Sequence, residues 1–163
     1  MIQRIISGGQ TGVDRAALDA ALALRIRCGG WCPRGRRAED GRIPDRYPLT
    51  ETPSADYQER TRENVLAGDA TLILTRGPLR GGSALTARFA RELDRPFRVV
   101  DLALEPEPRL LTRWLGDLRV EVLNIAGPRE SGVPGIYADS YAFVRELLAA
   151  TAVRQSIKLN TGL

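Results

Sequence analysis

The chain opens with a short β-branched stretch, Ile2 to Ile6, which passes directly into Ser7-Gly8-Gly9-Gln10-Thr11-Gly12-Val13-Asp14-Arg15. A strand that breaks into glycines and reopens as an alanine-rich helix leaves unpaired backbone N–H groups at the start of that helix. These groups and the positive end of the helix dipole point to the same place, where an anion is stabilised. The stretch therefore predicts a strand, a turn and a helix, with a phosphate-like group at the turn.

A structural explanation of the same turn stays open. Thr11 and Asp14 have the spacing of a capping box, and glycines also form tight turns that bind nothing. The stretch lacks the Gly-x-Gly-x-x-Gly spacing of dinucleotide-binding turns and the Gly-Lys-Ser/Thr ending of a Walker loop. By itself it indicates a phosphate-like ligand and says nothing about a reaction.

The length and composition are those of a single globular domain. The chain has 163 residues, of which 43% are hydrophobic and 27% are charged. We expect residues 1–153 to form one ligand-binding domain and residues 154–163 to form a polar tail. No apolar run approaches the roughly 20 residues that span a membrane, and the N-terminus lacks the layout of a signal peptide. We therefore expect a cytoplasmic protein that does not enter a membrane.

The sequence contains no histidine and only two cysteines, Cys28 and Cys32. The lack of histidine excludes a Ser-His-Asp triad and most zinc and non-haem iron sites. Three residues separate the cysteines, whereas a redox motif normally has two between them and a structural zinc site needs four ligands. We expect two reduced thiols and no metal held by protein ligands, although a contact of Cys32 with a soft metal stays open.

Nearly all of the positive charge comes from arginine, because Lys158 is the only lysine among 24 basic residues. The densest cluster consists of Arg34, Arg36, Arg37, Arg42 and Arg46. Guanidinium groups suit phosphate and carboxylate oxygens. The neighbouring acids Glu39, Asp40 and Asp45 would equally make this segment a solvated loop. From these residues alone, ligand binding and solvation remain alternatives.

The pattern along the chain alternates strands with helices. We expect strands at residues 3–7, 27–30, 70–75, 97–101 and 120–126, and helices at residues 12–24, 55–67, 84–93, 108–115 and 136–150. Ser83 would cap the helix that begins at residue 84. Residues 31–53 show no helical period, and we interpret them as a binding loop. The alternation predicts an α/β fold, a doubly wound and mainly parallel sheet of about five strands with helices on both faces.

Three glycine-bearing turns follow predicted strands. They comprise residues 8–12, 77–83 and 127–132. In sheets of this kind, ligands bind beyond the carboxyl ends of the strands, where the strand order reverses. Three such turns at one edge favour a ligand site over an explanation by packing alone.

Five motifs are spread over nearly the whole chain. They are Ser7 to Asp19; Gly30 to Gly41 with Ile43-Pro44 and Tyr47-Pro48-Leu49; Arg60-Thr61 with Asn64-Val65; Gly77 to Thr86; and Leu123 to Ser131. Together they resemble the motifs of the putative molybdenum carrier family, over about residues 5–148. The segment from Trp31 to Leu49 is specific to that family. The resemblance implies a Rossmann-like fold, related to cytokinin-activating nucleotide hydrolases, lysine decarboxylase-like proteins and DNA-processing recombination mediators.

The chain departs from those hydrolases at one position. They carry Pro-Gly-Gly-x-Gly-Thr-x-x-Glu at the second phosphate turn. The corresponding stretch here, Arg80 to Arg88, keeps Gly81 and Gly82 but has no glutamate at its end. The acid that acts on an N-glycosidic bond in those enzymes is missing, so the resemblance favours binding over hydrolysis.

The resemblance implies a binding and carrier protein for molybdenum cofactor, a pterin with a terminal phosphate and a dithiolene-bound metal. A carrier releases its cargo, so we expect no covalent chemistry, and molybdoenzymes are the implied recipients. An enzyme or sensor for a nucleotide-derived metabolite stays an alternative, with Asp14, Asp40 or Glu130 as general acid–base. A nucleic-acid binder is suggested by the basic composition, but the aromatic content of 6% argues against it.

In the carrier interpretation, glycine-turn amides hold anionic oxygens, arginines screen the remaining charge, and Asp14, Asp40 or Glu130 accepts from ring N–H groups. Trp31 or Tyr47 would stack on a flat ring. The expected cofactor-binding residues are Gly8, Gly9, Gln10, Thr11, Gly12, Asp14, Trp31, Arg34, Arg36, Arg37, Gly81, Gly82, Ser83, Thr86, Asn124, Arg129, Glu130 and Ser131. Molybdenum cofactor, molybdate and a nucleotide all remain open as the ligand.

We also expect a homo-oligomer. Leu110, Leu111, Trp114 and Leu115 lie on a short predicted helix, and one small sheet would leave part of that apolar surface uncovered.

Overall fold

A fully parallel five-stranded sheet forms the centre of the molecule. The computed structural model describes residues 1–160, with side chains described up to residue 152. The strand order is β2-β1-β9-β7-β8, and every neighbouring pair is parallel. The strands are β1 (Arg4–Ile6), β2 (Arg27–Gly29), β7 (Ala70–Thr75), β8 (Phe97–Asp101) and β9 (Val122–Ala126). The predicted Rossmann-like α/β fold is confirmed.

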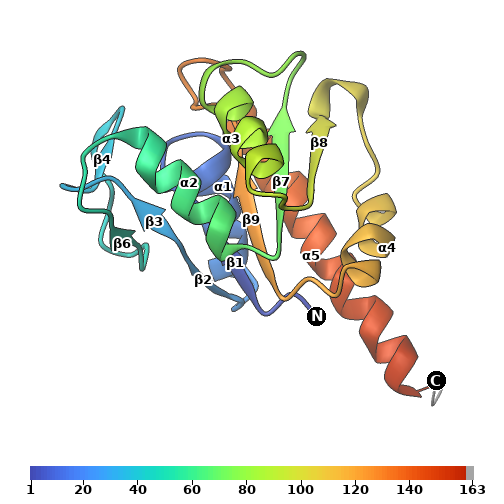
Figure 1. Cartoon of the computed structure of the whole chain (residues 1–163). Coiled ribbons are helices and arrows are strands. Elements are labelled where there is room, and N and C mark those ends of the chain that lie inside the picture. Colours follow the sequence, from blue (N-terminus) through green and yellow to red (C-terminus); the bar gives the residue numbers. More distant parts are fainter. Residues whose placement is uncertain (161–163) are drawn as a thin grey trace.

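Helices cover both faces of this sheet. They are α1 (Val13–Ala23), α2 (Tyr57–Ala67), α3 (Gly81–Glu92), α4 (Arg109–Asp117) and α5 (Ile136–Asn160), with a short 3₁₀ turn, η1 (Leu102–Leu104). Helices α2 and α3 pack on each other in front of the sheet, whereas α1 packs on α5 behind it (Figure 1). Strand β7 is buried along its whole length because helices lie over both of its faces.

The strand order brings the three glycine turns together. Strand β9 comes last in the chain but lies between β1 and β7. In a parallel sheet all carboxyl ends lie at one edge, so the turns after β1, β9 and β7 are neighbours there. This edge is the place where the sequence predicts a ligand.

Residues 31–53 contain four two-residue strands that the sequence pattern does not predict. They are β3 (Trp31–Cys32), β4 (Arg37–Ala38), β5 (Gly41–Arg42) and β6 (Thr50–Glu51). Strand β3 pairs with β6 in parallel, and β4 and β5 form an antiparallel hairpin. Two residues are too few for a hydrophobic period to be visible, which is why the segment was expected to be a loop without strands.

Two helix boundaries differ from the prediction by three residues or more, and the others differ by at most two. Helix α3 begins at Gly81, not after Ser83, because the amide of Ser83 donates to the carbonyl of Arg80 and closes the first turn earlier. Helix α5 continues to Asn160 instead of ending near residue 150, since no glycine or proline interrupts it. Residues 154–160 of the expected polar tail are therefore helical, and residues 161–163 lie outside the described residues.

Helix α4 buries much of the apolar surface that suggested self-association. Leu111 and Leu115 are 6% and 3% exposed and belong to the core of the chain itself. Leu110 is 71% exposed. The homo-oligomer stays a prediction, with a smaller apolar surface to support it. No helix in the described part of the chain is long and apolar enough to cross a membrane.

Candidate functional site

A cleft of about 710 Å³ opens at the carboxyl edge of the sheet. Its walls come from α2 and from the start of α3, and its floor and rim come from the ends of β1, β7 and β9 and the turns that follow them. Four arginines and two aspartates line it. Three of these arginines are ion-paired, with Asp14, Asp139 and Glu39, and Arg80 is the one without an ion pair among the described residues. The three glycine turns contribute to it in different ways.

The first turn holds an internal carboxylate. Asp14 is 5% exposed, and its Oδ2 accepts from the amide of Gln10 at 3.2 Å and from Nη1 of Arg60 at 3.2 Å. Burial raises the pKa of Asp14, while the Arg60 guanidinium and the Gln10 amide oppose that shift without cancelling it. The Gln10 amide, which we expected to bind a ligand, therefore donates to a carboxylate of the protein itself.

The glycines of the first turn are needed for close packing. A Cβ on Gly8 would lie 1.8 Å from Nη1 of Arg60, and a Cβ on Gly12 would lie 2.4 Å from the carbonyl oxygen of Pro128. Gly12 also has a φ of +78°, which side chains rarely adopt. The predicted capping box is wrong in its detail, because Thr11 Oγ1 accepts from the Glu130 amide and Asp14 accepts from Gln10.

The third turn is tied to the β4–β5 hairpin by a second carboxylate. Glu39 accepts from the amide of Ser131 at 3.1 Å, and from the hydroxyls of Ser131 and Thr11. Desolvation opposes ionisation of Glu39, but the hydrogen bonds from Ser131 and Thr11 outweigh it and lower its pKa. Arg129 lies 3.9 Å from the same carboxylate. The third turn therefore also donates to a carboxylate of the protein itself.

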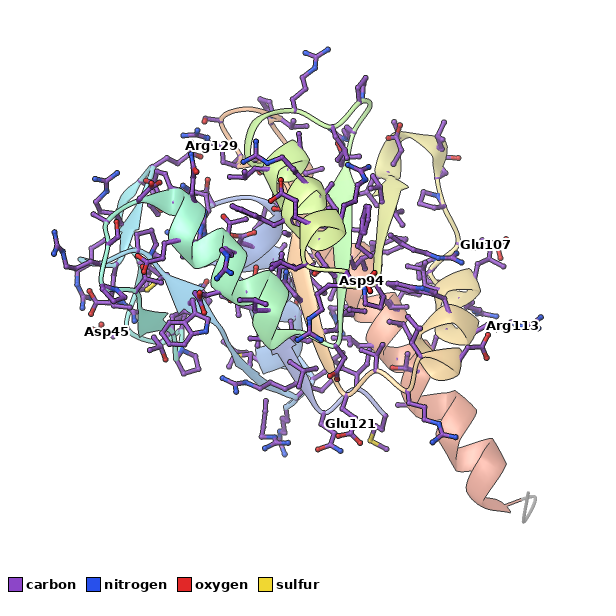
Figure 2. All side chains as sticks on the ribbon, viewed as in Figure 1. Asp45, Asp94, Glu107, Arg113, Glu121 and Arg129 are labelled. Carbon is purple, nitrogen blue, oxygen red and sulfur yellow. The ribbon has the colours of Figure 1, made fainter. Side chains whose placement is uncertain are left out.

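The second turn is open. A Cβ on Gly81 or Gly82 would have no atom within 4 Å, and among the described residues neither amide has a hydrogen-bond acceptor. These amides are the first two of helix α3, where the helix dipole favours an anion. Arg80 is exposed beside them, and Arg76 and Arg129 also line the cleft. In Figure 2, Arg129 lies at the upper edge of the molecule, on the segment that follows β9.

The wall opposite this turn comes from helix α2. Its Tyr57 ring lies 5.3 Å from the guanidinium carbon of Arg37 and 5.4 Å from that of Arg60. Asn64 is fully used in structure, because its side chain pairs with both the amide and the carbonyl of Trp31 at 2.8 and 2.9 Å. Tyr57 and Arg60 therefore place an aromatic ring and a guanidinium on this wall, beside the polar side chains of Gln58 and Thr61.

Half of the residues that the sequence nominated line this cleft. They are Gly8, Gln10, Asp14, Gly81, Gly82, Ser83, Thr86, Asn124 and Arg129. The others border or support it, or lie away from it: Gly9, Thr11, Gly12, Trp31, Arg34, Arg36, Arg37, Glu130 and Ser131. The three turns thus meet as predicted from their positions, whereas most of the 31–53 segment stays outside.

The predicted arginine clamp does not form at the cleft. Arg36 is 8% exposed, and its guanidinium donates to the carbonyl oxygens of Ile43, Pro44, Tyr47 and Leu49. Arg34 is exposed away from the cleft, and Arg37 lies over the ring of Tyr57. Arg36 thus holds the 31–53 segment in shape.

The other predicted ring and acid contacts also have internal partners. Trp31 is half-buried outside the cleft lining, and Tyr47 is only 1% exposed, with its hydroxyl donating to Asp19. Asp40 pairs with Arg15. Glu130 caps helix α5 by accepting from the amides of Gly135 and Tyr137 at 2.5 and 2.9 Å.

Several cleft residues were missing from the expected set. They are Tyr57, Arg60, Asn64, Thr75, Arg76 and Arg80. The sequence held a signal for some of them, because Arg60, Asn64 and Arg80 belong to the motifs that carry the family resemblance. Arg76 directly precedes the second glycine turn but was not among the expected binding residues, and Tyr57 lies outside any glycine turn or run of charge that would have marked it.

Comparisons with known proteins show which family and which solved structure this chain is similar to. Residues 5–148 match the family described as the circularly permutated YpsA SLOG family. The chain is also similar to a protein from Syntrophus aciditrophicus SB, named putative molybdenum carrier protein, whose crystal structure was determined at 1.45 Å resolution. The two share 46% sequence identity with a TM-score of 0.86, over 90% of this chain and 95% of that one. No curated protein matches the chain.

Proposed function

The chain belongs to the circularly permutated YpsA SLOG family, and on that premise we propose that it binds a small phosphate-bearing molecule in the cleft. The phosphate would lie at the start of helix α3, on the amides of Gly81 and Gly82, with Arg80, Arg76 and Arg129 around it. We propose molybdenum cofactor as the ligand, held without covalent chemistry and released to molybdoenzymes.

One observation carries this proposal, namely that an added Cβ would meet no atom within 4 Å at Gly81 or Gly82, whereas the glycines of the first turn are closely packed. In addition, one amide of the first turn donates to Asp14, and one amide of the third turn donates to Glu39. The second turn has free amides at the N-terminus of a 12-residue helix and lies beside Arg80, which has no ion pair among the described residues. Free amides, a helix dipole and arginines in one place favour a doubly charged phosphate over a neutral ligand.

The choice of ligand rests on the structural neighbour. That protein is named as a molybdenum carrier, and its sequence matches this chain over nearly its full length. The cofactor would be cargo, so the protein would need to shield it and release it rather than act on it.

A nucleotide-processing enzyme stays the second candidate because of Asp14. Of the three acids that the sequence offered as acid–base groups, only Asp14 lines the cleft, and burial raises its pKa. However, the Arg60 ion pair and the Gln10 amide already engage it. Arg88, at the position of the hydrolase glutamate, pairs with Glu92 outside the cleft lining. Carriage therefore has the stronger support.

The test is a substitution that blocks the open turn. Gly82→Val would cover the free amides, and Ala84→Val would place the same side chain on α3 outside the cleft lining. We expect Gly82→Val to lower the affinity for inorganic phosphate and for a pterin phosphate by about ten-fold or more, and Arg80→Ala to cost about 1.5–3 kcal/mol of binding. Titration calorimetry measures both effects, with thermal unfolding to check the fold.

The control and the identity of the ligand complete this test. Ala84→Val should bind as the unmodified chain does. If Gly82→Val and Ala84→Val bound equally well, the second turn would be only a connection between β7 and α3. Native mass spectrometry of protein purified without oxygen gives the mass of what the cleft retains, which separates molybdenum cofactor from a nucleotide and from molybdate.

A further inference from the structure

The described side chains contain three buried polar atoms that have no hydrogen-bond partner, and two of them belong to cleft residues. The three atoms are Nε of Arg60, Oδ1 of Asn124 and Oγ of Ser140. Arg60 and Asn124 line the cleft, whereas Ser140 lies on α5. Folded proteins pair nearly all such atoms, so an unpaired pair gathered in one cleft calls for a partner from outside the chain.

Asn124 supplies an acceptor. It lies on β9 between Ile6 of β1 and Thr71 of β7 and is 1% exposed. Its Nδ2 donates to Oγ1 of Thr71 at 3.2 Å, and its Oδ1 is the end without a partner. A buried carbonyl oxygen of this kind needs an N–H or O–H donor.

Arg60 supplies a donor on the neighbouring wall. One end of its guanidinium is bound to Asp14, and the group lies over the Tyr57 ring at 5.4 Å. These contacts fix the guanidinium but leave Nε–H without an acceptor among the described residues. Two residues that line the cleft therefore hold one buried acceptor and one buried donor without partners.

We infer that Asn124 and Arg60 form a subsite for the edge of a nitrogen heterocycle that carries an N–H donor next to a carbonyl or imine acceptor. Pterins and purines have such an edge, whereas molybdate, free phosphate and sugar phosphates do not. The inference rests on the proposed function, because the ligand's phosphate would occupy the start of α3. Asn124 and Arg60 then determine which phosphorylated compounds the cleft prefers. An oxyanion without a ring would occupy only the phosphate position at the start of α3.

The first measurement compares ligands on the unmodified chain. We expect neopterin monophosphate or GMP to bind about ten-fold or more tightly than ribose 5-phosphate, with inorganic phosphate and molybdate weaker still. The tighter of the two heterocyclic phosphates identifies the source of the ring. Methylation of N1 of GMP removes an N–H donor, so 1-methyl-GMP tests the contact with Asn124 if GMP is the tighter ligand.

The second measurement removes the acceptor. Asn124→Leu keeps a similar side-chain volume, and we expect the affinity of the preferred heterocyclic phosphate to fall several-fold toward that of ribose 5-phosphate, because only the Arg60 contact with the ring remains. Ser140→Ala removes the unpaired atom that lies outside the cleft, and this matched control should change no ligand affinity. If Asn124→Leu does not fold, the ligand comparison on the unmodified chain still decides.

The outcomes separate this inference from the proposed function. Equal binding of heterocyclic and sugar phosphates, or an Asn124→Leu variant that binds as before, would overturn the subsite while the phosphate site stands. Failure of every phosphate to bind, or binding that survives Gly82→Val, would overturn the proposed function itself.

Discussion

The first and second glycine turns have similar sequence signatures but differ in what occupies their amides. In the first turn, Asp14 lies four residues after Gln10 and accepts from its amide, and the Arg60 side chain covers Gly8. In the second turn, the nearby acid Asp101 accepts from Gly77, and the amides of Gly81 and Gly82 stay free within the described residues. The second turn therefore keeps two amides free at the start of α3, although a carboxylate is bonded to Gly77 of the same turn.

The largest expected effect separates the packing glycine from the open one. Gly12→Ala places a Cβ 2.4 Å from the Pro128 carbonyl at a φ of +78°, whereas a Cβ on Gly82 meets nothing within 4 Å. We expect Gly12→Ala to lower the free energy of unfolding by about 4 kcal/mol or more. Gly82→Ala should change it by less than about 1 kcal/mol, because alanine also suits a helix better than glycine. Urea unfolding followed by circular dichroism measures both.

This comparison breaks if the two variants are equally stable. The close approach of Pro128 would then not explain why residue 12 is a glycine. The difference in packing between the first and the second turn would also have no effect on stability.

The next effect concerns two arginines that the sequence treats alike. Arg36 is buried and donates to four carbonyl oxygens of the 31–53 segment, whereas Arg34 is exposed. Arg36→Ala should lower the free energy of unfolding by about 3 kcal/mol, because it leaves buried carbonyls without donors. The matched variant Arg34→Ala should stay within about 0.5 kcal/mol of the parent. Equal losses for the two variants would show that the carbonyl contacts contribute nothing net.

The fold could be predicted because its main strands and helices have long, regular patterns. The apolar run of β7 and the alternation of strands with helices fixed the α/β class, and β7 and β8 agree with their predicted bounds. The strands of the 31–53 segment could not be predicted, since each has two residues and depends on pairings made in three dimensions.

The site was only half predictable for a similar reason. Glycine turns mark backbone positions in the sequence, so Gly81 and Gly82 could be nominated. The burial of Arg36 and the pairing of Asp14 with Arg60 depend on contacts between residues far apart in the chain. Arg76 and Tyr57 reach the cleft only through the packing of the elements that carry them.

The smallest expected effect tests whether the third turn is held by a charged group. The pKa of Glu39 lies below its ordinary value of 4.5, because the hydrogen bonds from Ser131 and Thr11 outweigh the cost of burial. Its stabilising contribution is therefore complete above that value and is lost as the pH falls through the lowered pKa of the folded state. We expect Glu39→Gln to cost about 1 kcal/mol near pH 6, since the group lies near the surface, and progressively less as the pH falls through the lowered pKa.

The measurement is urea unfolding of Glu39→Gln and of the parent at several pH values. The other acids are common to both proteins, so their titration cancels in the difference. Glu63→Gln on α2 provides a control for the loss of one surface carboxylate, because Glu63 pairs only with its neighbour Arg62 among the described residues. A difference for Glu39→Gln that stayed constant across this range would mean that Thr11 and Ser131 bind the neutral amide as well as the carboxylate. The negative charge of Glu39 would then contribute nothing to holding the third turn. The third turn would differ in this respect from the first turn, where the buried Asp14 is paired with Arg60.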